Sequence, residues 1–478
     1  MPSINCAQLR PDSRYVVFGA ALLQVFLVAT PIYFVPQVFW AVPALALALG
    51  FFLFSVERTL WLLLIVTIAL PASLLSGLVL PGGLRLQEGF LLLACFFALI
   101  DWVYRRDLSL LHTAADRPVL CFLLVVVFSI AVGFLHGNSA SVIWRDARFP
   151  LYFIAFFLVT NFVSKQSVLR RYAPLLVLLG LLVALEYVLE FVGAIDLSVG
   201  DRFVRVARLQ GMVLPLALLL VVSQLVFAPQ RWGKPLLLAL FFPIGLAFVL
   251  TVGRSMWASF AIGLFCIGYM HSRLRGGGGG GRWRAVLLIL MILVLLVGTV
   301  FFFQRFTGAA IGAHVFERSR SLVEYEENVH VLGRLFSYAV ALESIVQHPI
   351  IGNGQGATLM LLNFDEEMLR FEWTRAWTVD NLYLTILLKM GLLGFATFFW
   401  MYIRSMRLAW RAFHDSDNAD TRAFCAAAFA MLAGLLALGI GNAAMINGRF
   451  ALVYAALFAL VAVVAKGVVE EKDDAQTR

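Results

Sequence analysis

The chain has 478 residues, of which 62% are hydrophobic and only 14% are charged. A soluble protein of this size needs many more charged residues to cover its surface, so the composition excludes a soluble globular protein and indicates an integral membrane protein. The net charge of +9 comes from 37 basic and 28 acidic residues. Because many basic residues lie in short loops between apolar segments, they predict orientation in a membrane and argue against a nucleic-acid partner.

Apolar segments of about 20 residues, the length that crosses a bilayer, follow one another along most of the sequence. We predict an all-α, polytopic membrane bundle of about twelve to fourteen transmembrane helices. The predicted spans lie near 16–34, 36–55, 59–79, 86–104, 118–136, 149–164, 172–193, 210–228, 235–252, 255–271, 284–303, 381–403, 423–440 and 449–467. The polar residues 1–14 precede a full-length apolar segment, which predicts a retained first span and no cleavable signal peptide.

The positive-inside rule predicts a cytoplasmic N-terminus. The basic residues then assigned to the cytoplasmic side are Arg105, Arg106, Arg117, Lys165, Arg170, Arg171, Arg231, Lys234, Arg273, Arg275, Arg282, Arg284, Arg404, Arg407 and Arg411. The predicted domains are a transmembrane bundle over residues 1–303, an outer loop over 304–380, C-terminal spans over 381–467 and a cytoplasmic tail over 468–478. Both termini are therefore expected in the cytoplasm.

The outer loop is the longest polar interruption of the sequence, and its pattern predicts one helix. From Val331 to Gln347 apolar residues recur mostly at i, i+3, i+4 and i+7, which is typical of an amphipathic helix lying against the membrane or the bundle. The helix is expected to end at His348-Pro349, and the glycines at 352, 354 and 356 predict a tight irregular turn. Concentrating polar residues in one loop predicts chemistry or recognition there.

Every cation that this topology places on the outer face is an arginine. Arg208 opens the span that begins near Gly211, Arg254 lies in a tight turn between two spans, and Arg334 lies in the first turn of the loop helix. The planar guanidinium binds phosphate oxygens in pairs and tolerates partial burial. An ionisable residue held at membrane depth is a functional-site hypothesis by default. The alternatives are binding to lipid headgroups or pairing with a neighbouring carboxylate.

Three further ionisable residues lie within predicted spans. Glu186 and Glu190 are four residues apart and share one helix face, where they could pair with an arginine of the site or form an inter-helix ion pair. Lys389 lies about two and a half turns below Asp380, where it could pair with a carboxylate or hold the bundle together. The cysteines and histidines show no ligand spacing, so we predict neither a metal nor a cofactor.

An ordered set of short motifs resembles the O-antigen ligase and polymerase superfamily, the WaaL-like and Wzy-like proteins. The motifs are Arg208-Leu209-Gln210-Gly211, Thr251-Val252-Gly253-Arg254-Ser255, Gly333-Arg334, His348-Pro349-Ile350-Ile351-Gly352-Asn353-Gly354, Asp380-Asn381-Leu382-Tyr383-Leu384 and Gly391-Leu392-Leu393-Gly394. They are similar in order and spacing to that family's motifs over about residues 145–400. Each motif alone is weak, and their order carries the resemblance.

The resemblance implies a bacterial inner-membrane glycosyltransferase with a GT-C-like fold and its active face in the periplasm. Such enzymes take an undecaprenyl-diphosphate-linked glycan as donor, and a sugar hydroxyl attacks the anomeric carbon, usually with inversion. They need no metal. The negative charge of the leaving diphosphate must then be met by fixed cations, a role for which we select Arg208, Arg254 and Arg334.

The sequence departs from the family at Asp380, where the family places a proposed catalytic histidine. An aspartate is the weaker base at neutral pH unless burial raises its pKa, although a carboxylate could also orient the attacking hydroxyl. A third interpretation is that Asp380 caps the next helix. We predict Asp380 and Arg254 as catalytic residues, with supporting roles for His348, Asn381, Glu186 and Glu190.

Within the family, the aspartate favours a Wzy-like polymerase of O-antigen or exopolysaccharide. The alternatives are a ligase that moves glycan onto lipid A-core and a protein O-glycan ligase. From another class, a flippase or exporter of lipid-linked sugars would be expected to show an internal repeat, and none is evident. The implied partners are the lipid-linked donor, an acceptor glycan or lipid A-core, membrane lipids, a flippase and a chain-length regulator.

Overall fold

The computed structural model describes residues 55–70, 79–80, 84–105, 112–191, 209–251, 253–274, 329–365, 370–448 and 450–477, together with single residues between 290 and 305. The chain forms two compact units. The first unit comprises residues 1–63 and 87–108, and its described part holds the start of α3 (Val56–Ala69) and nearly all of α5 (Leu86–Arg105). The second unit comprises residues 64–86 and 109–478 and carries every feature discussed below.

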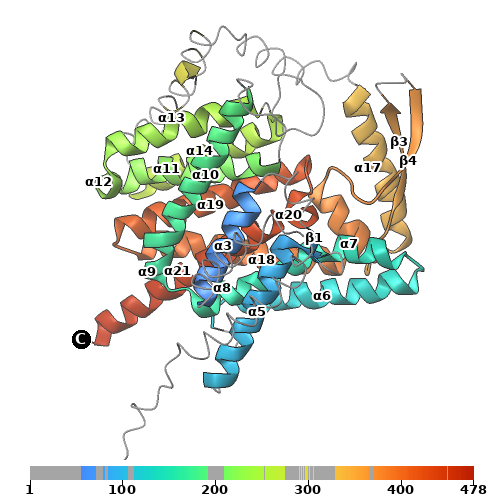
Figure 1. Ribbon diagram of the computed structural model, residues 1–478, viewed down its shortest axis with the longest axis horizontal. Helices are drawn as coiled ribbons and strands as arrows, with labels where there is room; N and C mark the ends of the chain where they lie inside the picture. The colour runs from blue at the N-terminus through green and yellow to red at the C-terminus, as the bar shows by residue number, and fades with distance from the viewer. Residues whose placement is uncertain are drawn as a thin grey trace, which may run out of the picture. The chain divides into compact units, whose positions relative to one another are not determined.

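The second unit is a helical bundle with two small hairpins (Figure 1). Its helices before the long loop are α6 (Asp116–Leu135), α7 (Ala140–Leu151), η4 (Tyr152–Ile154), α8 (Ala155–Phe162), α9 (Lys165–Ser167), η5 (Val168–Tyr172), α10 (Ala173–Phe191), η6 (Leu209–Met212), α11 (Val213–Phe227), α12 (Pro229–Trp232), α13 (Lys234–Leu250) and α14 (Arg254–Leu274). The remaining helices are α17 (Val329–Gln347), α18 (Leu382–Asp415), α19 (Ala419–Ile440), α20 (Ala444–Asn447) and α21 (Ala451–Thr477). The hairpins pair β1 (Val79–Leu80) with β2 (Leu84–Arg85), and β3 (Leu359–Asp365) with β4 (Arg370–Ala376).

The prediction of an all-α, polytopic membrane protein is confirmed. Within the described residues, six helices are long and apolar enough to cross a membrane: Leu86–Tyr104, Asp116–Leu135, Lys165–Phe191, Leu382–Asp415, Ala419–Ile440 and Ala451–Thr477. The apolar helices α11 and α13 are shorter. The predicted spans at 16–34 and 36–55, and most of 284–303, lie outside the described residues. The described chain therefore contains fewer full-length spans than the sequence predicts.

The predicted span at 149–164 takes a different form. It is divided among the end of α7, the 3-10 turn η4 and the short helix α8. Pro150 lies inside α7, and a proline lacks the N–H that would continue the helical hydrogen bonds. Hydropathy alone does not reveal such a break, because residues 149–159 form one continuous apolar run.

The core of the unit lies around α19 and α21, whose candidate spanning segments are 72% and 89% buried. Small residues let α19 approach α14 closely, which is typical of helix pairs in membranes. A side chain on Gly434 would meet the backbone oxygen of Ser259, and one on Gly263 would lie 3.3 Å from the carbonyl oxygen of Ala430. Since residue number rises along one helix as it falls along the other, α14 and α19 are antiparallel. The start of α14 and the end of α19 therefore lie at the same end of the bundle.

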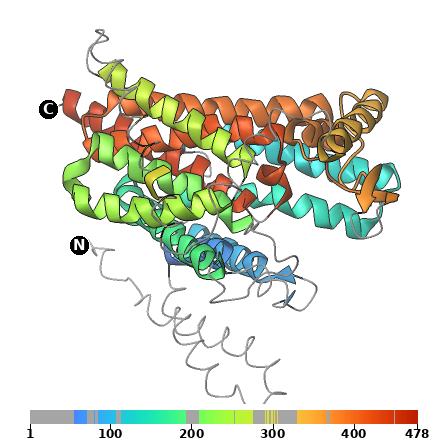
Figure 2. The ribbon, with the colours of Figure 1, turned by 90° about the horizontal axis from the view of Figure 1, so that it is seen from above.

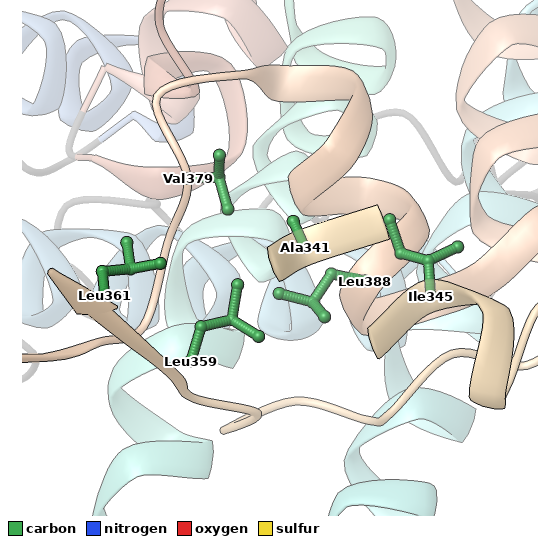
Figure 3. Packing of buried hydrophobic residues seen from close by; sticks show 6 residues of the cluster. All are labelled: Ala341, Ile345, Leu359, Leu361, Val379 and Leu388. Carbon is green, nitrogen blue, oxygen red and sulfur yellow. The ribbon is translucent and has the colours of Figure 1, made fainter. Parts of the chain in front are cut away.

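The long loop folds into α17 and the β3–β4 hairpin. The helix predicted in this loop is confirmed as α17, whereas the hairpin was not predicted. Six buried apolar residues join α17, the hairpin and α18 in one cluster (Figure 3): Ala341, Ile345, Leu359, Leu361, Val379 and Leu388. Figure 2 shows α17 and the hairpin at the end of the unit away from the C-terminus. This cluster fixes the loop on α18 and so sets the positions of the polar residues at its edge.

Candidate functional site

The first element of the site is an exposed ion pair between the loop helix and the segment that leads into α18. Nε of Arg334 lies 3.6 Å from Oδ2 of Asp380, and the two side chains are 49% and 65% exposed. Two residues that the sequence analysis selected independently, 46 positions apart, are thus in contact. The carboxylate of Asp380 is not buried, so the burial that a base role was expected to need is absent.

Tyr338 holds this pair against the bundle. It lies one turn along α17 from Arg334, and its hydroxyl is 3.0 Å from the carbonyl oxygens of both Asp380 and Ile440. The hydroxyl has one proton, which it donates to one of these acceptors at a time. Burial is the main cause that raises the pKa of Tyr338, and Asp380 raises it further, whereas Asn381 and Arg334 lower it. The net increase keeps the hydroxyl protonated at neutral pH.

Asn381 is the residue that caps α18. Its side-chain oxygen accepts a hydrogen bond from the backbone N–H of Leu384 at 3.0 Å, and its side-chain nitrogen donates to the carbonyl of Ile440 at 3.1 Å. The capping interpretation offered for Asp380 therefore belongs to its neighbour. With the cap supplied by Asn381, the side chain of Asp380 is left for its contact with Arg334.

A second group of motif residues meets where α10, α11 and α13 approach one another. Gly211 packs so closely that a side chain there would lie 2.5 Å from the hydroxyl of Tyr187 and 3.3 Å from the Thr251 methyl group. Thr251 is 2% exposed and accepts a hydrogen bond from the backbone of Gly253 at 3.3 Å. The turn before Arg254 is thus short and fixed, as the sequence predicts.

The structure describes only some of the residues that the sequence analysis selected for the site. Arg254 is the first residue of α14, but its side chain lies outside the described part, as does all of Arg208. Glu186 and Glu190 are half-buried in α10, on either side of Tyr187, and both make contacts with other groups. They therefore lie on the same helix segment that packs against the Arg208–Gly211 motif.

The end of α19 connects the two groups. Ile440 accepts hydrogen bonds from the Tyr338 hydroxyl and the Asn381 side chain, and Gly439 packs against Leu382. The antiparallel packing described above places the start of α14, and so Arg254, at this same end of α19. The backbones that carry Arg254, Arg334 and Asp380 consequently converge on one end of the bundle.

The His348–Gly356 segment has a structural role in this arrangement. It inserts between α6 and a break in α18, where Gly391 has φ 59 and ψ −161. Asn353 and Gly354 donate backbone hydrogen bonds to the carbonyls of Leu388 and Lys389 at 2.8 and 3.1 Å, and Gln355 donates to Ser129 of α6 at 2.9 Å. We call residues 348–356 the latch, because their hydrogen bonds join the two helices.

His348 belongs to the latch rather than to the exposed ion pair. Its ring lies against that of His136, with ring centroids 4.6 Å apart. It follows the last turn of α17, fourteen residues after Arg334, which is about 21 Å along a helix axis. The structure therefore does not bring His348 to Asp380.

A buried ion pair is hydrogen-bonded to the last residue of the latch. Nζ of Lys389 lies 2.8 Å from Oδ2 of Asp146, with the side chains 3% and 1% exposed. The same carboxylate oxygen accepts the backbone N–H of Gly356 at 3.1 Å. The carboxylate partner predicted for Lys389 is therefore Asp146 of α7, which the sequence analysis did not select.

Arg145 is a further residue that the sequence analysis did not select as part of the site. Its guanidinium carbon lies 4.1 Å from the ring centroid of Trp377, and its buried Nε has no hydrogen-bond partner within the described residues. Trp377 is 43% exposed and lies three residues before Asp380. Among the described residues, no three His, Cys, Asp or Glu side chains gather closely enough to hold a metal ion.

Comparison with known proteins identifies one matching region of the chain. Residues 236–399 match the family model Wzy_C, described as O-antigen ligase, and this region includes Arg254, Arg334, the latch and Asp380. No curated protein matches the chain. A solved structure titled "Structural coordination of polymerization and crosslinking by a peptidoglycan synthase complex" shares 19% sequence identity with this chain. The match covers 73% of this chain and 97% of that chain, with a TM-score of 0.39. Residues 236–399 are therefore similar to the O-antigen ligase family, and the six apolar helices agree with a multi-pass membrane protein.

Proposed function

We propose that the chain is a glycosyltransferase of the bacterial inner membrane that works on its periplasmic face. It takes an undecaprenyl-diphosphate-linked glycan as donor and acts as a Wzy-like polymerase of O-antigen or exopolysaccharide. The observation that carries the proposal is the exposed contact between Arg334 and Asp380, which lies within the region matched by the family model. An arginine and a carboxylate at one accessible point are the groups that an anionic leaving group and an attacking hydroxyl require.

The arginine supplies positive charge to the leaving group. In this contact only Nε of Arg334 faces Asp380, so the two terminal nitrogens of its guanidinium retain their donors for diphosphate oxygens. We assign Arg254, at the start of α14, and Arg208, from its sequence motif, to the same cationic site. As the acceptor oxygen bonds to the anomeric carbon, the bond from that carbon to the phosphate oxygen breaks, and its electron pair leaves with the diphosphate. Fixed cations stabilise this developing charge without reorganising.

The carboxylate acts on the acceptor. Because Asp380 is exposed and held beside Arg334, we assign it the role of accepting a hydrogen bond from the attacking sugar hydroxyl, which aligns the oxygen with the anomeric carbon. The hydroxyl proton passes to this carboxylate or to solvent as the new bond forms. Tyr338 and Asn381 act as positioning residues, since both fix the backbone that carries Asp380.

The acceptor distinguishes the members of this family. A polymerase joins the donor glycan to another lipid-linked glycan, whereas a ligase transfers it to lipid A-core. The aspartate at position 380 favours the polymerase. A protein O-glycan ligase would use the same donor site with a protein hydroxyl.

The experiment uses the full chain reconstituted in lipid vesicles with an undecaprenyl-diphosphate-linked oligosaccharide as the only sugar, and the products are separated on a gel. A ladder of longer glycans is expected. Replacing Arg334 with Gln should reduce the rate by about 100-fold, the effect of removing one preorganised donor. Arg375→Gln is the matched control, because Arg375 is an exposed arginine of β4 in the same loop and lies outside the proposed site.

Two further arms separate the alternatives. Adding lipid A-core should leave the ladder unchanged, and a single product on lipid A-core without a ladder would identify a ligase. A wild-type rate in Arg334→Gln would remove the exposed pair from the chemistry. Movement of labelled donor across the vesicle membrane without any glycan product would indicate that the protein is a flippase and not a glycosyltransferase.

A further inference from the structure

A second polar feature lies between the start of α6 and the middle of α18. A cavity of about 560 Å³ opens between the start of α6, the residues before it and the middle of α18. Its lining includes Arg117, Arg404, Arg407, Trp400 and Ile403. The latch is hydrogen-bonded to Ser129 of α6, which lies twelve residues after Arg117, or about 18 Å along the helix. The cavity is therefore separate from the Arg334–Asp380 site.

The cavity carries uncompensated positive charge. Arg117, Arg404 and Arg407 make no ion pair with any described residue. Nε of Arg404 donates to the carbonyl of Ala114 at 3.1 Å, which holds the side chain across the cavity and leaves its terminal nitrogens available. The nearest carboxylate in sequence, Asp116, is buried and accepts hydrogen bonds from the backbone and hydroxyl of Thr113. Among the described residues, three guanidinium groups thus share one cavity and form no ion pair with an acid.

The cavity also has an apolar wall. Trp400 and Ile403 are 49% and 44% exposed, and they lie on the turns of α18 just before the two arginines. Free phosphate would gain nothing from such a wall, whereas a molecule with a phosphate head and hydrocarbon tails would contact both parts. A tryptophan next to basic residues is also typical of the depth at which lipid headgroups meet the hydrocarbon layer.

We propose that this cavity binds an anionic phospholipid, with its phosphate held by Arg117, Arg404 and Arg407 and its acyl chains lying along Trp400 and Ile403. The positive-inside rule places these arginines in the cytoplasmic leaflet, where basic pockets between helices hold anionic headgroups. The bound lipid joins α6 to α18, the same two helices that the latch joins at the far end. It thereby stabilises the scaffold on which the loop is mounted.

The test measures lipid retention by the full chain in native mass spectrometry, with phosphatidylglycerol or phosphatidylcholine added at equal concentration. The wild type should retain phosphatidylglycerol and release phosphatidylcholine. The double variant Arg404→Gln/Arg407→Gln should bind phosphatidylglycerol about 30-fold more weakly, at about fivefold for each arginine. Arg411→Gln is the matched control, because it is exposed on the same helix one turn beyond Arg407 and lies outside the cavity.

Two other measurements keep the test decisive. Arg117→Gln removes one charge from α6 instead of α18 and should weaken binding about fivefold, which serves if the double variant does not fold. Inorganic phosphate in excess should not displace the lipid. Equal retention by the double variant, by Arg117→Gln and by the wild type would overturn the proposal. So would retention of phosphatidylcholine at the level of phosphatidylglycerol, or displacement by phosphate, which would identify a site for a free anion.

Discussion

The substitution Gly354→Ala tests whether the latch holds the scaffold of the site. Gly354 has φ +80, and a Cβ there would lie 2.2 Å from the backbone nitrogen of Gly133 and 2.4 Å from its Cα. Gly137 provides a matched control, since it has φ +75 but a Cβ there would meet no atom within 4 Å. Both alanine variants carry the strain of a left-handed backbone, and only Gly354→Ala adds a clash.

The two contributions can be separated. The left-handed conformation costs a non-glycine residue about 1–3 kcal/mol, which both variants share. Overpacking adds about 1–3 kcal/mol, and the atoms that must move are backbone atoms of α6. Shifting the latch away from α6 also lengthens the bond from Gln355 to Ser129, at about 1 kcal/mol. We therefore expect Gly354→Ala to be less stable than Gly137→Ala by about 2–4 kcal/mol.

The measurement is thermal unfolding of the purified chain in one detergent. Because membrane proteins of this size commonly unfold irreversibly, the variants are compared at one scan rate. The midpoint of Gly137→Ala should lie below that of the wild type by the backbone strain alone, and the midpoint of Gly354→Ala should lie well below both. Equal midpoints for the two alanine variants would mean that α6 moves aside freely, and the latch would then hold nothing together.

Three further substitutions separate stability from activity. Lys389→Met leaves Asp146 buried without its cation and should destabilise the fold by about 3–5 kcal/mol, and Lys389→Met/Asp146→Asn should restore most of this in the same thermal assay. Tyr338→Phe removes a hydroxyl that contacts two carbonyls, so it should cost about 1 kcal/mol of stability and slow the glycan ladder. Asn381→Ala removes the cap of α18 and should cost about 1 kcal/mol, whereas Asn381→Ser keeps a capping oxygen and should cost less.

Helical periodicity made much of the architecture predictable. The amphipathic pattern from Val331 to Gln347 predicted α17 to within two residues, because a helix with one apolar face has a local signature. The hairpin had no such signature. The first strand reads Leu-Met-Leu-Leu-Asn-Phe-Asp, a short apolar run that periodicity does not distinguish from a buried helix segment.

The site was predictable only in part, since its contacts join distant segments. Arg334 and Asp380 could be selected from residue type and position, but nothing local in the sequence indicates their contact. Asp146 could not be found in the same way. It lies in an ordinary amphipathic segment, and only the fold places it beside Lys389, 243 residues later. The role of Gly354 in the latch likewise depends on Gly133 of α6, which lies more than 200 residues earlier.

Burial separates the polar residues that support this site from those we propose to act in it. The Lys389–Asp146 pair is almost completely buried, and removing one partner of such a pair is strongly destabilising, so structure alone accounts for it. The Arg334–Asp380 pair is about half exposed, and exposed pairs contribute about 0–1 kcal/mol to stability. The stability that this pair contributes therefore does not explain why Tyr338, Asn381 and the end of α19 surround Asp380. A carboxylate fixed by its backbone while its side chain stays accessible suits a group that must meet a substrate.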